Sequence, residues 1–372
     1  MQRRPMIPLE ICLDVIDRLS LDCCTLRACA LTCSAWLPRA RVHLYKSITL
    51  HKPETYRLFS QAIAGTPILG ALVTNLECCV TTVDDEIWDD AAATEALFPI
   101  EAVRTLTRLH YLALMGADCH YAIHPKVLDF VPRFALATSA TSLLVSEFTV
   151  TSPKDIIDML KHFPHIQELS LDHHTSYRDF DAPPIETLPS DFCRDLTNFV
   201  FHWSDLYAPF LAVMPTHITV LDIEYLPPTR VRAGPEDSWA DIARFKGLKT
   251  LYLDAHHGEG KEWVAEALQH ARCDKLESLG LDYTCECQNG CEMPFTEQHA
   301  NLAHLASIIF RSSAFRKLKS LHVSVTAAYP REERDSEGGL AGLQARLQQS
   351  LNDIFDKCRS RGTEVKVYLN RF

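Results

Sequence analysis

The chain of 372 residues is too long for one compact core and suits an elongated array or two domains. Its 48 acidic and 37 basic residues leave a formal net charge of −11, which argues against nonspecific nucleic-acid binding, because that binding needs a basic surface. No apolar run reaches the length that spans a bilayer, and Pro8, Glu10 and Asp14 interrupt any signal-peptide core.

Most of the 14 cysteines stand inside apolar patterns, where a free cysteine acts as a small hydrophobic side chain. Examples are Cys12, Cys29, Cys78, Cys193 and Cys358. The sequence also contains no Asn-x-Ser/Thr sequon. These features predict a reducing intracellular compartment, either the cytosol or the nucleus.

The first fifty residues predict two or three short helices. Pro8 stands at the opening of the first helix, and Glu10 lies in its first turn, where a carboxylate meets the helix dipole favourably. Two apolar stripes follow at helical spacing, one through Ile7, Ile11, Val15, Ile16 and Leu19 and one through Leu26, Cys29, Ala30, Cys33 and Trp36. A module of about forty residues is near the lower limit of a self-sufficient core, so we expect it to have a partner.

This segment resembles the F-box. Ile7-Pro8-x-Glu10-Ile11 stands where the family opens with Leu-Pro-x-Glu-Ile/Leu, and Thr32-Cys33-Ser34-Ala35-Trp36 matches its Val-Cys-x-x-Trp close. Leu19 and Leu26 match leucines of its first and second helices, and residues 37–50 are similar to the exit of many fungal F-box proteins. The alternative is an ordinary helical cap on the domain that follows.

A short apolar pattern recurs through the rest of the chain, with one apolar residue followed by two more at the third and fifth positions after it. The copies are Tyr45/Ile48/Leu50, Val73/Leu76/Cys78, Leu109/Leu112/Leu114, Ile166/Leu169/Leu171, Leu196/Phe199/Phe201, Ile218/Leu221/Ile223, Leu248/Leu251/Leu253, Leu276/Leu279/Leu281 and Leu318/Leu321/Val323, with a weaker copy at 143–148 and a terminal strand at 365–369. Steps of about 22 to 42 residues separate most copies, and self-similarity at such a period indicates a solenoid.

The last two apolar residues of each copy point to one face of a short strand, because they are two positions apart. Helical segments such as 153–160 and 261–268 fall between copies, so each unit is predicted to run strand, loop, helix, loop. One unit cannot bury its apolar side alone, whereas stacked units bury it against each other. The pattern resembles the irregular intracellular leucine-rich repeat, and the alternative is a different α/β fold with parallel strands. Near the C-terminus, an amphipathic helix is predicted to cap the stack through Leu340, Leu343, Leu347, Leu351, Ile354 and Phe355.

Residues that alternate with the buried positions should line the concave side of the strands. From the fourth unit on, these residues include several acids and no lysine or arginine. The candidates for substrate binding are Asp172, Asp222, Glu224, Tyr252, Asp254 and Asp282. Carboxylates on neighbouring strands would form a negative groove for a basic segment. The alternative is that acids are simply common in this chain.

Features of an enzyme are sparse. The sequence has no Gly-x-Ser-x-Gly, no His-Glu-x-x-His and no dinucleotide fingerprint, so we expect no catalytic residues and no cofactor. Cys285, Cys287 and Cys291, with Cys273 before them and His299 after, form an incomplete zinc pattern, because no second clean pair follows. We expect a cysteine-bearing surface loop and no metal there, and a zinc protein or metal-dependent enzyme is the alternative.

The two resemblances together predict an α/β protein with an F-box helical module over 1–42 and a leucine-rich-repeat-like horseshoe over 43–372. This layout implies a non-catalytic substrate receptor of an SCF-type (Skp–cullin–F-box) ubiquitin ligase. The F-box would dock on the Skp adaptor, and through it on a cullin, while the repeats hold the protein substrate. The resemblance assigns docking to Ile7, Pro8, Ile11, Ile16, Leu26, Cys33 and Trp36. Some of these must hold the helical core instead, and the sequence does not sort them. A repeat scaffold without a ligase is the alternative.

Overall fold

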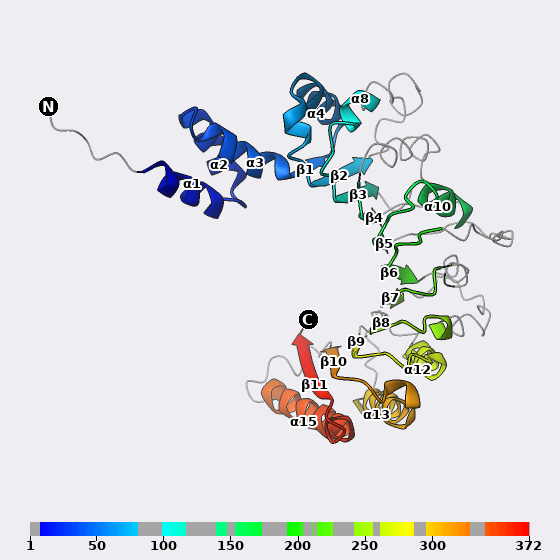
Figure 1. Cartoon of the computed structure of the whole chain (residues 1–372). Helices are drawn as coiled ribbons and strands as arrows, with labels where there is room; N and C mark the ends of the chain where they lie inside the picture. The colour runs from blue at the N-terminus through cyan, green and yellow to red at the C-terminus, as the bar shows by residue number, and fades with distance from the viewer. Residues whose placement is uncertain are drawn as a thin grey trace. The chain divides into compact units, whose positions relative to one another are not determined.

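The computed structural model describes residues 8–80, 99–116, 139–146, 153–172, 192–203, 211, 214–225, 242–255, 261–285, 295–327 and 339–371. The chain divides into two compact units. Unit 1 comprises residues 1–151 and 155–166, and unit 2 comprises residues 152–154 and 167–372. Figure 1 follows the elements in chain order.

Unit 1 begins with three helices, α1 (Leu9–Arg18), α2 (Cys23–Thr32) and α3 (Leu37–Lys46). The first turn of α1 follows Pro8, and the Asp22 side chain starts α2 by accepting a 3.0 Å hydrogen bond from the Thr25 backbone N–H. The helices share a small core of Ile16, Leu26 and Ala40, against which pack Leu13, Leu19, Cys29, Ala30, Trp36 and Leu44. The helical module therefore has an apolar centre of its own.

The predicted boundary between residues 42 and 43 lies near the end of the third helix. It falls within α3, which continues to Lys46 because His43 and Leu44 still contact the first two helices or their core. Strand β1 (Ser47–Leu50) then follows α3 directly. From here on, the helical module means residues 9–46.

The remainder of unit 1 consists of strands and helices. After β1 come α4 (Pro53–Gly65), α5 (Pro67–Gly70), β2 (Asn75–Val80), α8 (Ile100–Val103), β3 (Tyr111–Gly116), β4 (Ser142–Ser146) and α10 (Pro153–Leu160), most of which belongs to unit 1. Strands β1 to β4 pair in chain order and are parallel. Parallel neighbours need a crossover between them, and the intervening segments supply it.

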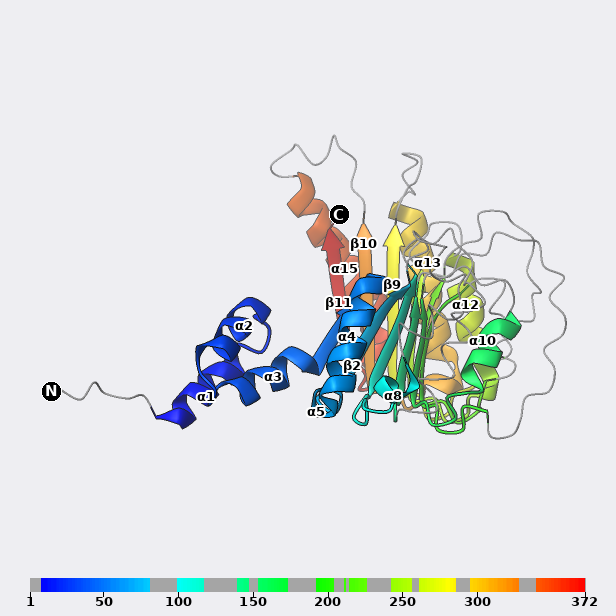
Figure 2. The same ribbon diagram turned by 90° about the horizontal axis from the view of Figure 1, so that it is seen from above.

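Unit 2 adds further strands, and described helices separate its strands from β8 onward. Its strands are β5 (Glu168–Asp172), β6 (Asn198–Trp203), β7 (Val220–Tyr225), β8 (Thr250–Ala255), β9 (Ser278–Cys285), β10 (Ser320–Ala327) and β11 (Glu364–Arg371). Its helices are α12 (Lys261–His270), α13 (Phe295–Arg311), the short 3₁₀ helix η3 (Ser313–Phe315) and α15 (Gly339–Arg359). The helices α12, α13 and α15 lie along one face of the strands, which run side by side in the same direction (Figures 1 and 2).

Strands β1 to β10 of the described sheet each coincide with a copy of the apolar pattern, and β11 coincides with the predicted terminal strand at 365–369. The sheet has 11 strands whose order follows the chain. In unit 2 the two alternate apolar residues of each copy are buried, as Leu251 and Leu253 are on β8. The leading apolar residue is buried too, as Leu248 is in the turn before β8. These observations confirm the α/β class with parallel strands and are compatible with a solenoid.

The turns before the strands also stack regularly in unit 2. Before each of β7 to β10, the residue that precedes the strand donates its backbone N–H to the carbonyl of its equivalent one repeat earlier, and Glu364, the first residue of β11, donates to the residue before β10. The donors and acceptors are Thr219 to Thr197, Lys249 to Thr219, Glu277 to Lys249, Lys319 to Glu277 and Glu364 to Lys319, at 2.8 to 2.9 Å. Each repeat thus satisfies the backbone of its neighbour, which is how stacked units stabilise one another.

The predicted C-terminal amphipathic helix is α15. Its Leu351, Phe355 and Cys358 are buried, and the helix packs against α13 and β11. Strand β11 ends the strand order, so α15 covers the apolar side of the last strand, as a capping helix should.

Candidate protein-interaction surfaces

The helical module exposes apolar side chains although it has a core. On α1, the side chains of Ile11 and Val15 are 53% and 50% exposed. Residues four apart lie next to each other on a helix surface, so these two form one contiguous apolar area, which we call the α1 apolar pair. Leu9 at the start of the helix is also exposed, and so are Leu21 before α2 and Leu31 near its end. Scattered exposed leucines are ordinary, whereas adjacent ones indicate a contact surface.

The structure sorts the residues to which the sequence assigned adaptor docking. Pro8, Ile11 and Cys33 are exposed, and Trp36 is partly buried against the module core. Ile7 lies outside the described residues. Ile16 and Leu26 lie in the module core with side chains at most 1% exposed, which favours for them the core role that the sequence left open beside docking. Val15, which the sequence placed in the same stripe as Ile16, is the exposed neighbour instead.

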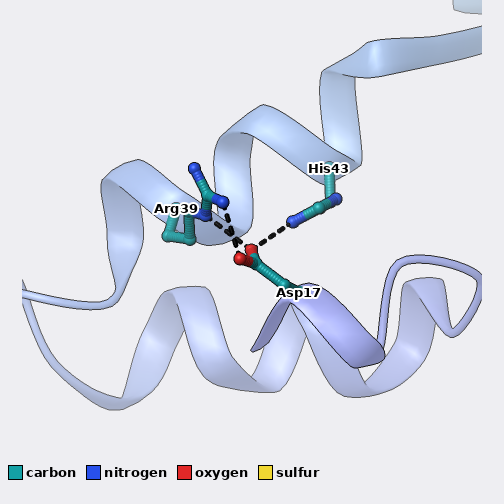
Figure 3. A network of polar contacts seen from close by, with 3 residues as sticks. All are labelled: Asp17, Arg39 and His43. Atoms are coloured by element: carbon teal, nitrogen blue, oxygen red, sulfur yellow. Dashed lines mark hydrogen bonds and ion pairs between the residues drawn. The ribbon is translucent and has the colours of Figure 1, made fainter. Parts of the chain in front are cut away.

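A polar network fastens α1 to α3 beside this core (Figure 3). Arg39 donates to both carboxylate oxygens of Asp17, with Nε 2.5 Å from Oδ1 and Nη2 2.6 Å from Oδ2. His43 Nε2 lies 2.8 Å from the same Oδ1. Paired donation of this kind from a guanidinium fixes the geometry of a carboxylate. No spacing in the sequence predicted this network, since Arg39 and His43 lie 22 and 26 residues beyond Asp17.

The network makes the stability of the helical module depend on pH. Hydrogen bonds from Arg39, and secondarily from His43, hold the pKa of the Asp17 carboxyl well below its ordinary value of 3.8. A lowered folded-state pKa stabilises the fold above the ordinary value and loses that contribution as the pH falls. We therefore expect the amide protection of α1 and α3 to weaken below about pH 4, and to weaken less steeply in Asp17→Asn. Hydrogen exchange of the wild type and the variant, followed as the pH is lowered through about 4, measures this loss of protection. Asp14→Asn is the matched control, because Asp14 is exposed and pairs with Arg18 at 3.3 Å.

The second surface is the polar face of the strands in unit 2. Apart from the buried Gly280, the residues of β7 to β11 that alternate with the buried apolar ones are half-buried or exposed, and strand pairing places them in rows. One row runs Asp222, Tyr252, Gly280, His322 and Lys366 on β7 to β11. The next row runs Glu224, Asp254, Asp282, Ser324 and Tyr368. We call the part of these two rows on β7, β8 and β9 the acidic strand face.

Five of the six predicted substrate-binding residues meet on the acidic strand face. Asp222 and Tyr252 are directly paired, and Glu224, Asp254 and Asp282 follow one another on three adjacent strands. Asp172 ends β5, which lies two strands away from β7. Glu224, Asp254 and Asp282 are carboxylates on adjacent strands, and neighbouring strands are about 4.8 Å apart, so negative potential is concentrated on this face.

Sequence reasoning missed two features of this surface. Lys366 and Tyr368 extend the rows onto β11, so the polar face carries a cation at its end, where Lys366 Nζ lies 3.1 Å from Glu364 Oε1. The alternation of polar and apolar residues over 364–368 was sufficient to predict that Lys366 and Tyr368 extend the rows. The second feature is the contact of Tyr252 with Gly280. This contact could not be predicted without knowing the register in which β8 and β9 pair.

The cysteine-rich segment considered for zinc lies mostly outside the described residues, with Cys287 and Cys291 among those not described. Cys273, which was considered with it, is fully buried, and burial raises the pKa of its thiol to about 12. Metal binding requires a thiolate, so this side chain suits packing. Within the described ranges, His, Cys, Asp and Glu side chains form no group with the arrangement of a metal site.

No protein-family model matches the chain, and no curated protein matches it significantly in sequence. In the part of the chain that the structure describes, no helix has both the length and the apolarity needed to cross a bilayer.

Proposed function

We propose that the chain is the substrate-recognition subunit of an SCF-type ubiquitin ligase. In this proposal the helical module is an F-box that docks on a Skp adaptor, and the strands and helices that follow are irregular leucine-rich repeats that hold a protein substrate. The observation that carries the proposal is the α1 apolar pair, half exposed on a module whose own core is already filled by Ile16, Leu26 and Ala40.

The physical argument concerns what those exposed side chains gain from a partner. Burying apolar surface stabilises an association by roughly 25 cal/mol per Å². Ile11 and Val15 are not among the side chains of the module core and are about half exposed, so a partner that covered them would bury apolar surface that the module leaves open. The motif residues Pro8 and Cys33 are exposed on the same module, which supports a protein partner there.

The proposed receptor performs no bond chemistry. It raises the effective concentration of substrate lysines near a charged ubiquitin-conjugating enzyme that the cullin brings to the complex. The proposed compartment is the cytosol or nucleus, where such a complex works. Free and buried cysteines such as Cys78, Cys193 and Cys273 fit this environment, since burial raises the pKa of each thiol to about 12 and keeps it unreactive.

A repeat scaffold without a ligase role is the second candidate. Regular stacking of unit 2 and its polar strand face favour protein binding in either case. The two candidates differ only in what covers the helical module, because a scaffold needs no adaptor there.

Co-purification separates the two candidates. The tagged full chain is expected to retain a Skp adaptor and a cullin, and a chain lacking residues 1–46 is expected to lose both while still folding. Circular dichroism of the shortened chain checks the fold. Equal recovery of the adaptor with both chains, or recovery with neither, contradicts the ligase proposal.

A further inference from the structure

The strand order ends at β11, and one edge of this strand is open. Among the described residues, only β10 pairs with β11. The Glu364 N–H donates to the carbonyl of Lys319 on the β10 side. Backbone groups alternate in direction along a strand, so the N–H and C=O groups of Val365 and Val367 point away from β10. No described strand pairs with them on that side.

The apolar side of the sheet is also less well covered at β11 than at the strand before it. Leu321 and Val323 on β10 are 0% exposed. Val365 and Val367, which stand opposite them in the sheet, are only partly buried although α15 packs beside β11. Each unit of a stack is covered by its neighbours, and the last unit lacks one of them. A further strand at this edge would pair the backbone and cover the two valines together.

The register of β11 suits pairing with a second copy of itself. Two copies related by a twofold axis would pair antiparallel, with the residues that have outward backbone groups opposite one another. An axis at Val367 places Val367 opposite its equivalent and Lys366 opposite Tyr368 of the second copy. An axis at Lys366 would instead oppose two lysines, which is unfavourable. An axis at Tyr368 would leave the lysine opposite Asn370, with neither an acid nor a ring facing it.

The facing of Lys366 and Tyr368 gives this pairing a specific attraction. They would form a non-hydrogen-bonded pair, in which the Cα atoms are about 4.5 Å apart and the side chains are closest. Tyr368 is 49% exposed, and its ring stacks on His322 of its own chain with centroids 6.5 Å apart. The Lys366 side chain is 46% exposed. A lysine on an edge strand ordinarily opposes pairing, whereas here each lysine meets a ring that attracts it.

We propose that β11 is a self-association edge, through which two copies of the chain pair antiparallel with Val367 at the twofold axis. The contact uses the same edge of both copies, so it closes at a dimer and does not propagate. This inference goes beyond the proposed receptor role and does not depend on adaptor docking. It would place two helical modules and two acidic strand faces in one assembly.

Sedimentation velocity of the purified full chain over about a hundredfold range of concentration tests the dimer, because self-association grows with concentration. Val367→Pro removes an outward N–H and leaves the pairing with β10 intact, since an edge strand tolerates proline on its open side. Each dimer then loses two hydrogen bonds, so self-association is expected to weaken by at least about tenfold. Thr49→Pro is the matched control, on the outward side of β1 at the other end of the strand order, and is expected to change nothing.

Further variants test the register. Tyr368→Lys opposes lysines twice in the dimer and is expected to weaken self-association by about fivefold or more, whereas Tyr368→Phe keeps the ring and should associate like the wild type. The Cα atoms of a hydrogen-bonded pair are about 5.5 Å apart, which suits a disulfide. With oxidised glutathione, Val367→Cys is therefore expected to form more covalent dimer than the wild type. Lys366→Cys, which does not face its equivalent, is expected to form no excess.

The same measurements can overturn the inference. A wild type that stays monomeric at every concentration contradicts it and leaves the edge to a strand of another protein. So does an undiminished dimer in Val367→Pro, equal weakening by Thr49→Pro, or equal cross-linking at positions 366 and 367. Thermal unfolding checks the fold of each variant, and if Val367→Pro has lost it, Tyr368→Lys and Val367→Cys decide. Adaptor co-purification by these variants is expected to be unchanged, so failure here is distinct from failure of the ligase proposal.

Discussion

Replacing Ile11 and Val15 together by lysine is expected to weaken Skp-adaptor binding by at least about thirtyfold without lowering thermal stability. Both side chains are about half exposed, so the unbound module loses little when they change. In the complex, each lysine would place a charge at a dry apolar contact, and central contacts of this kind each contribute about 2 kcal/mol or more. Affinity of the purified variant for the adaptor measures the effect.

The matched control for this variant lies in the next two helices. Leu58 on α4 and Ile68 on α5 are 52% and 69% exposed, so Leu58→Lys with Ile68→Lys makes the same change in charge and apolarity outside the helical module. This control is expected to bind the adaptor like the wild type. Equal weakening by both double variants would mean that the α1 apolar pair has no special role.

Leu26→Ala is expected to destabilise the helical module by about 2 to 5 kcal/mol, because Leu26 is fully buried at the module centre. A core of about forty residues has little stability in reserve, so a loss of this size unfolds most of it. Hydrogen exchange should show lost protection in α1 to α3 and unchanged protection in β5 to β11. Adaptor binding is expected to fall as well, but through unfolding.

The contrast between these variants distinguishes a core residue from a contact residue. Ile11→Lys with Val15→Lys should keep exchange protection and lose the adaptor, whereas Leu26→Ala should lose both. Unchanged protection in Leu26→Ala would contradict the assignment of Leu26 to the core.

The strands could be predicted because their pattern is specific. Two apolar residues two positions apart point to one face, and the leading residue fixes the turn, as Leu248, Leu251 and Leu253 illustrate. Aligning the copies therefore predicted which residues stand opposite each other on neighbouring strands. The acidic strand face follows from the same alternation, which is why Asp254 and Asp282 were placed correctly on adjacent strands.

The helical module could not be resolved in the same way. Val15 and Ile16 are consecutive, and both fit an apolar stripe, yet one is half exposed and the other is buried. Which of the two side chains faces inward depends on how the three short helices pack. The sequence of the first helix alone is compatible with either orientation. The contact of Tyr252 with Gly280 and the Asp17–Arg39–His43 network depend likewise on packing between elements.

Calorimetric titration of the purified full chain with a purified Skp adaptor tests most directly whether uncovered apolar side chains of the helical module are a docking surface. The account predicts saturable binding of one adaptor per chain with a negative heat-capacity change, the mark of apolar burial, and loss of binding in Ile11→Lys with Val15→Lys. Absence of binding, or binding that this double variant leaves intact, would contradict it.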